Sequence, residues 1–119
     1  MEIKKRNTGH LLSLFKEHWS PKIIEKVNNH EIKLVKILGD FEWHSHKDSD
    51  EMFFVIKGNF TMHLRLENIF LEEGDFIVVP KGVEHKPSAS RECEVMLIEH
   101  AGIVNTGDAV DIVGLSEEK

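Results

Sequence analysis

The sequence contains no tyrosine, a single cysteine and three prolines, and it has no long apolar run. With only Cys93 available, the chain has no internal disulfide and no cysteine-based zinc site, which is typical of a reducing compartment. A membrane-spanning helix needs about 20 consecutive apolar residues, whereas the longest runs here are short, such as residues 76–80. Residues 1–8 are not followed by the apolar stretch of a signal peptide. We therefore expect a cytoplasmic location and no membrane association.

Basic residues are also scarce. Lysine and arginine total 15 against 21 aspartates and glutamates, which gives a formal net charge of −6. Such a chain repels a phosphate backbone, so nucleic acid is not an expected partner. The absence of tyrosine removes one common general acid. Histidine, in contrast, is abundant, with eight in 119 residues.

The length and the turn pattern predict one all-β domain over residues 1–119. A chain of 119 residues is the size of one domain. Residues 60–66 alternate between apolar and polar, which is the period of a strand with one buried face. Many short strands with frequent turns indicate a sandwich or a closed barrel. The turn signals are Gly39-Asp40, Lys57-Gly58-Asn59, Glu67-Asn68, Glu73-Gly74-Asp75 and Lys81-Gly82.

The N-terminal part predicts a helix followed by a hairpin. Leucine and phenylalanine spacing over residues 7–18 suits a short amphipathic helix, capped by Thr8 and ended before Pro21. Residues 19–27 and 31–38 are compatible with two strands joined by a turn.

The strongest chemical signal is the pair His44 and His46. Residues two apart in a strand point to the same side, so both imidazoles would face one site. A His-x-His pair alone is more often a feature of a surface strand. Glu51, which opens the next apolar run, and His85, which follows a tight turn, could complete a set of three imidazoles and one carboxylate. Such a set leaves positions open on a six-coordinate divalent metal.

These residues resemble the cupin superfamily. Its first motif is a glycine, five residues, His-x-His, three or four residues, a glutamate, six residues and a glycine, matched here by Gly39, His44, His46, Glu51 and Gly58. Its second motif is a glycine, five residues, Pro-x-Gly, two residues, a histidine, three residues and an asparagine, matched by Gly74, Pro80, Gly82 and His85. The chain departs from the motifs at two points: four residues separate Gly39 from His44, and Ala89 replaces the asparagine.

The resemblance implies a jelly-roll barrel, the cupin double-stranded β-helix, with a short N-terminal helix. Within it we expect a helix and hairpin at 7–38, a metal-binding barrel core at 39–100 and a C-terminal extension at 101–119. His44, His46, Glu51 and His85 would hold one divalent ion per chain, namely iron, manganese, zinc or nickel. The chain is similar to small single-domain cupins often labelled mannose-6-phosphate isomerase-like.

Two functions remain open at this point. Isomerase and dioxygenase chemistry both occur in the resembled superfamily, so the protein is expected to be a metal-dependent enzyme on a small polar substrate such as a sugar or an organic acid. The alternative is a non-catalytic, metal-dependent module that binds a small molecule. A catalytic acid or base is not identified, and the candidates are Glu42, Glu84 and His63.

Three further expectations concern packing. Phe53 and Val55 share a strand face with Glu51 and should line the cavity. Cys93 should be a small buried hydrophobe. Residues 19–27 lie outside the barrel with apolar residues on both faces, so we expect a homodimer in which a neighbouring chain covers them.

Overall fold

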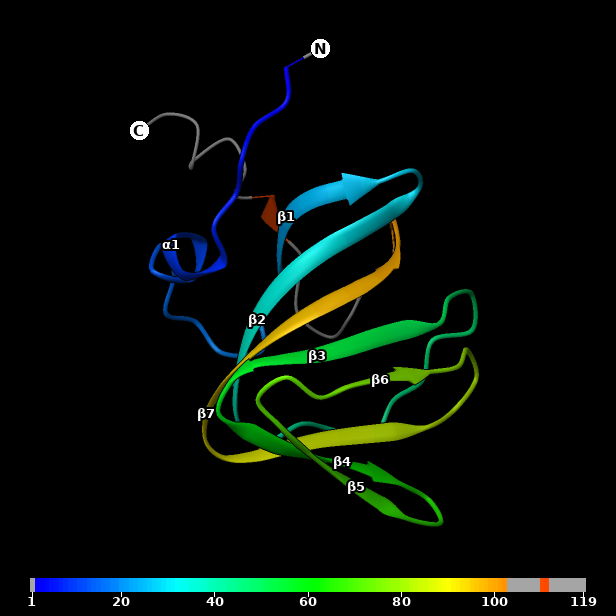
Figure 1. Ribbon diagram of the computed structural model, residues 1–119. Helices are drawn as coiled ribbons and strands as arrows, with labels where there is room; N and C mark the ends of the chain where they lie inside the picture. The colour runs from blue at the N-terminus through cyan, green and yellow to red at the C-terminus, as the bar shows by residue number, and fades with distance from the viewer. Residues whose placement is uncertain (1, 103–109, 112–119) are drawn as a thin grey trace.

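The computed structural model describes residues 2–102 and 110–111, and strands make up most of it (Figure 1). This confirms the all-β fold with a short N-terminal helix. No helix among the described residues is long and apolar enough to cross a membrane. The elements are α1 (Thr8–Leu12), β1 (Lys22–Val27), β2 (His30–Asp40), β3 (Glu51–Lys57), β4 (Asn59–Leu64), β5 (Asn68–Glu72), β6 (Phe76–Val79), β7 (His85–His100) and β8 (Val110–Asp111).

The long strand β7 organises the barrel. One of its edges pairs with β2 along most of its length, and the two strands run side by side in Figure 1. Its other edge is shared: the first residues pair with β4 and the later residues pair with β3. The remaining strands extend these pairs, β5 on β4 and β6 on β3. Residues of strands β2 to β7 share one buried cluster, so these strands enclose a single barrel interior.

The barrel interior is filled by alternating residues of these strands. Phe53 and Val55 are buried on the same face of β3 as Glu51, as period two predicted, but only Phe53 lines the cavity next to Glu51. The strand β2 also contributes to this core, with Val35. Cys93 is fully buried, as expected, and burial raises the pKa of its thiol to about 12.

The predicted helix over residues 7–18 is wrong in extent and in its cap. The helix ends at Leu12, and its cap is Asn7, whose side chain accepts a 2.8 Å hydrogen bond from the backbone N–H of His10. The chain leaves the helix because contacts with the sheet fix it instead: the Lys36 ammonium donates a 2.8 Å hydrogen bond to the carbonyl of Phe15. Short helices depend on packing more than on spacing.

The helix covers the outer face of the N-terminal hairpin. The hairpin itself forms as predicted, with β1 and β2 paired antiparallel. Leu11, Leu12 and Phe15 form a second apolar cluster with Ile24 of β1 and Leu34 of β2. Ile24 of β1 is therefore covered within the same chain, and the expectation that residues 19–27 lie outside the barrel is wrong, because Trp19 packs against the barrel core.

Gly58 closes the turn between β3 and β4 at a point of close approach, which generates a stability prediction. Gly58 has φ +90°, and a Cβ there would lie 3.0 Å from the carbonyl oxygen of Glu92. Gly74 has the same φ, but a Cβ there meets nothing within 4 Å. Both alanine variants carry the left-handed cost, about 1–2 kcal/mol. We expect Gly58→Ala to lower the free energy of unfolding in urea by more than Gly74→Ala, because only the former also pushes against backbone. Equal losses would contradict this.

Candidate metal centre

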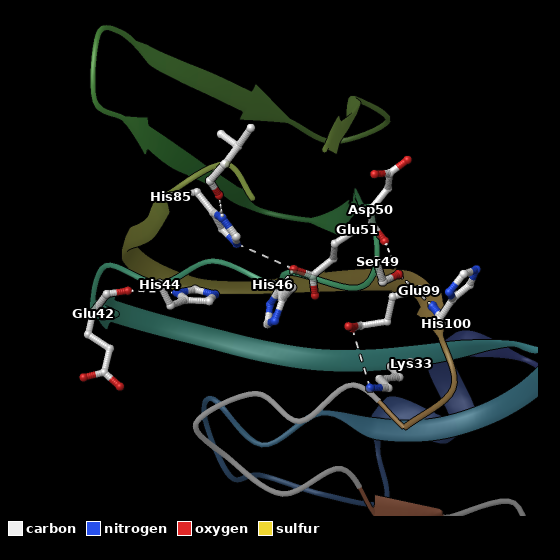
Figure 2. Close-up of polar contacts among 11 residues, drawn as sticks. Lys33, Glu42, His44, His46, Ser49, Asp50, Glu51, His85, Glu99 and His100 are labelled. Carbon is white, nitrogen blue, oxygen red and sulfur yellow. Dashed lines mark hydrogen bonds and ion pairs between the residues drawn. The ribbon is translucent and has the colours of Figure 1, made fainter. Parts of the chain in front are cut away.

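Four side chains from three parts of the chain converge inside the barrel (Figure 2). His44 and His46 lie between β2 and β3, Glu51 opens β3, and His85 opens β7. Each offers one ligand atom, and these atoms all lie within 4.8 Å of one another. The structure thus brings together the four residues that the sequence singled out.

The two histidines of the His-x-His pair are not in a regular strand, contrary to our expectation. The segment is irregular, and His44 forms an isolated bridge with His85 through backbone hydrogen bonds of 3.1 and 2.9 Å. This bridge ties the first motif directly to the second and leaves the two rings with centroids 4.2 Å apart. His46 is held separately, since its carbonyl accepts a 2.7 Å hydrogen bond from the N–H of Gly82.

Backbone carbonyls set the orientation of two imidazoles. The Nδ1 atom of His44 lies 2.9 Å from the carbonyl oxygen of Glu42, and Nδ1 of His85 lies 2.9 Å from that of Val83. A carbonyl only accepts, so each Nδ1 carries the proton and each Nε2 keeps its lone pair for the centre. Burial lowers the pKa of His44, which favours the neutral ring that a metal requires.

The atoms that face the centre have no hydrogen-bond partner among the described residues. They are Nε2 of His46, Nε2 of His85 and Oε1 of Glu51, all buried. The Glu51 oxygen lies 3.3 Å from the first nitrogen and 3.6 Å from the second. Buried polar atoms without partners cost free energy. A divalent ion bound by nitrogen and oxygen would satisfy all three at once, so the donor set fits such an ion.

Comparison with known proteins agrees with this geometry. The family described as "Cupin domain" matches residues 34–100. The chain belongs to this cupin family. It is similar to a solved cupin-2 domain protein of Shewanella frigidimarina, with 47% identity, 80% of this chain and 93% of that chain covered, and a TM-score of 0.79.

Two further relatives support the assignment of this cupin. A solved protein of Neisseria meningitidis is 34% identical, with 82% of this chain and all of that chain covered and a TM-score of 0.76. The uncharacterized protein YdbB of Bacillus subtilis is 30% identical over 82% of this chain and 87% of its own length. The similarity therefore extends over most of the cupin and its relatives.

A second, charged layer lies behind Glu51 in this cupin, and sequence analysis missed it. In Figure 2, Glu99 stands between Glu51 and Lys33, whose ammonium is 3.5 Å from the Glu99 carboxyl group. The side chains of Lys33 and Glu99 are fully buried. The sequence does contain a signal for Glu99: it follows Val95 and Leu97 at period two, so it should face inward with them.

The two neighbouring carboxyl groups have opposite pKa shifts. Burial, and then the charge of Glu51, raise the pKa of Glu99 above its ordinary value. Burial alone would raise the pKa of Glu51 as well, but His46 and His85 bring it below the ordinary value. The two shifts therefore favour the negative charge on the carboxyl group that faces the centre over the one behind it.

The three candidate acids or bases lie away from the centre. Glu42 and Glu84 are exposed, and Glu84 forms a 3.1 Å ion pair with Arg65. His63 lies on the opposite face of β4 from the buried Phe60 and bonds to Ser88 and Asn68. None of them lines the cavity that His44 and Glu51 border.

The layer behind Glu51 generates a prediction about metal affinity. Glu99→Gln keeps a polar group of the same shape behind Glu51, so the metal affinity should stay within a few-fold of the wild-type value. Glu99→Leu removes the polar neighbour of Glu51 and should weaken metal binding by about 10–100-fold. Competition with a chromophoric chelator measures both.

The leucine variant needs a control because it leaves the Lys33 ammonium beside an apolar group. The double variant Lys33→Met with Glu99→Leu replaces both members by apolar side chains, an exchange that proteins often tolerate. It should fold and still show the weakened metal affinity. Wild-type affinity in this folded double variant would mean that Glu99 does not position Glu51.

Proposed function

We propose that this cupin binds one divalent metal ion through His44, His46, Glu51 and His85 and uses it to hold and activate a small molecule. The observation that carries the proposal is the set of three buried atoms without hydrogen-bond partners, two imidazole nitrogens and one carboxylate oxygen, facing one another. Iron, manganese, zinc and nickel all accept nitrogen and carboxylate ligands, and which ion occupies the site in cells depends on availability.

The chain's own residues prepare the site for such an ion. Carbonyl groups hold the His44 and His85 rings, burial keeps His44 neutral, and the Glu99 layer keeps the charge on Glu51. When bound, the ion would supply a Lewis acid and, if it is iron or manganese, a redox centre. No described residue lining the adjacent cavity, apart from His44 and Glu51, can exchange a proton.

The absence of a further acid or base in the described cavity favours one reaction type. An isomerase must move a proton between two positions of its substrate, and it needs a protein group to carry it. A dioxygenase, which adds both atoms of dioxygen to a substrate, relies chiefly on the metal. We therefore favour the dioxygenase over the isomerase. The same observation favours the second candidate, a non-catalytic module in which the metal only holds a ligand.

The four proposed ligands generate a prediction about metal content. We expect about one divalent ion per purified chain, and we expect His44→Ala combined with His85→Ala to reduce this below a tenth. Elemental analysis measures both, with His63→Ala as the control histidine variant because His63 lies outside the centre. Unchanged metal in the double variant would place the ion elsewhere.

The chelator competition that measures metal affinity, repeated at several pH values, adds a second readout. The folded pKa of His44 is lowered, so this ring stays neutral above and slightly below its ordinary value of 6.5. Metal affinity should be nearly constant above pH 6.5 and should start to fall only somewhat below it, because protons compete for this imidazole once the pH approaches its lowered pKa. A flat profile would argue against imidazole ligands.

Turnover distinguishes the enzyme from the binding module. The protein is stripped of metal, reloaded without air with each of the four ions, and mixed with hydroxy acids, keto acids, catechols and phosphosugars. We expect dioxygen consumption with one substrate class in the iron(II) or manganese form, abolished in His85→Ala. No consumption with any ion, together with metal-dependent ligand binding, would assign the module.

We also propose that the protein is a homodimer, with the contact on the outer face of β3 and β6. Phe54 pairs with Phe76 and Met52 with Val78, so an apolar surface runs across the two strands. Phe76 is 63% exposed. The surface adjoins the part of the sheet that α1 covers, and a second copy of the same face would bury it.

This contact generates a prediction about mass in solution. The protein should have twice its 13.7 kDa chain mass at micromolar concentration, and Phe76→Glu should convert it to a monomer. Leu66→Glu is the control, because Leu66 is 99% exposed and lies in a turn away from the two strands. Multi-angle light scattering gives both masses. A monomeric wild-type protein, or a dimeric Phe76→Glu variant, would reject the contact.

A cytoplasmic location is part of the same proposal. It is supported by Cys93, the chain's single cysteine, which is fully buried and so cannot pair with another protein's thiol while the chain is folded.

A further inference from the structure

The cavity beside the metal centre is almost entirely apolar. Of the described residues that line it, all except His44 and Glu51 are hydrophobic or proline. No lysine, arginine or aspartate is among these lining residues. The cavity volume is about 40 Å³, which is room for a few waters, and its mouth is open, so a larger ligand would extend out of it.

One wall of the cavity is an aromatic stack that leads to the centre. The Trp19 and Phe41 rings are stacked with centroids 4.7 Å apart and an angle of 21° between their planes. The Phe41 ring in turn meets the His44 ring edge-on, with centroids 5.0 Å apart. A ligand that reaches the ion past His44 must therefore contact flat, apolar surfaces.

Trp19 is held in this wall by a strained backbone. Its φ is +59°, a left-handed conformation that a bulky side chain rarely adopts. Two hydrogen bonds of 2.9 Å fix it, from its backbone N–H to the carbonyl of Lys36 and from its indole N–H to the carbonyl of Leu38. Strain that the surroundings maintain is concentrated at ligand sites. Here its effect is to place an indole beside the cavity.

We infer that the ligand of this cupin is an uncharged, ring-sized molecule with an apolar body and one or two adjacent oxygen atoms that reach the metal. This inference rests on the proposed function, since the oxygens need the ion as their partner. The apolar body packs on the Trp19 and Phe41 wall, and His44 and Glu51 mark the end of the cavity where the oxygens lie.

Polar ligands lack partners in the described cavity. A sugar would bury several hydroxyl groups against Val35, Phe53 and Leu97, and each hydroxyl left without a hydrogen bond weakens binding. A phosphate or a free carboxylate would also need a cation, and the buried ammonium of Lys33 is already engaged with Glu99. The apolar lining therefore favours a neutral ring over the phosphosugars and organic acids that also fit the superfamily.

The two tryptophans allow a direct test. Trp43→Phe leaves Trp19, in the cavity wall, as the single tryptophan reporter. Trp19→Phe leaves Trp43 as the control reporter. Trp43 packs against the Arg65 guanidinium, which lies 3.8 Å from its ring centroid. Zinc-loaded protein is titrated with catechol, cyclohexane-1,2-diol, mannose 6-phosphate and glycolate. Calorimetry measures the dissociation constants, and elemental analysis of the same samples measures the metal.

We expect catechol or cyclohexane-1,2-diol to bind at least about tenfold more tightly than mannose 6-phosphate and glycolate. The ring ligand should change the fluorescence of Trp43→Phe and leave that of Trp19→Phe nearly constant. Trp19→Ala and Phe41→Ala should each weaken ring binding about tenfold while metal content stays at one per chain, and Trp43→Ala should leave both unchanged.

The outcomes separate this inference from the proposed function. Three results at full metal content would overturn the neutral-ring ligand and leave the metal centre standing. They are tighter binding of mannose 6-phosphate or glycolate, no binding of either ring, and ring binding that is insensitive to Trp19→Ala. Protein that takes up no zinc but still binds a ring through Trp19 overturns the metal centre and supports the apolar site.

Discussion

Glu51 is a carboxylate that the fold buries at the inner end of β3, and the arrangement of the whole site depends on keeping it charged there. Two imidazoles face it from 3.3 and 3.6 Å, and neither makes a hydrogen bond with it. Behind it, Glu99 has a raised pKa and stands between Glu51 and the Lys33 ammonium. Such a cluster is costly in an apolar barrel unless a further positive charge completes it. The divalent ion that we propose at the centre would supply that charge, and its four ligands would be the residues that the fold already brings together.

The barrel determines where this cluster can form. Because β7 pairs with β2, β3 and β4, its first residue, His85, lies beside the irregular segment that carries His44 and His46, and its last residues lie beside the start of β3. The bridge between His44 and His85 fixes the two motifs against each other. Further along β3 from Glu51 the interior becomes apolar, where Phe53 and Val55 are buried. The site therefore combines a charged end with an apolar body, and the neutral-ring ligand that we infer follows from this division.

Much of this was predictable from particular residues. The match of His44, His46, Glu51 and His85 to the cupin motifs was enough to group them, and period two was enough to bury Phe53 and Val55. The extent of the helix was not predictable, because the Lys36 side chain captures the Phe15 carbonyl from a distant strand. The role of Trp19 was hidden for a similar reason: its backbone is left-handed, and its partners Lys36 and Leu38 are remote in sequence. Lys33 and Glu99 were each visible as inward-facing charges, but only the pairing of β2 with β7 brings them behind Glu51.

Anomalous X-ray diffraction from crystals of the purified protein, recorded on both sides of the absorption edge of the ion found by elemental analysis, tests the central claim most directly. The account predicts one strong peak per chain, at about 2.0–2.2 Å from Nε2 of the three histidines and from an oxygen of Glu51, with no sulfur ligand. A metal-bearing crystal with its peak elsewhere, or with Glu51 turned away from the ion, would contradict it.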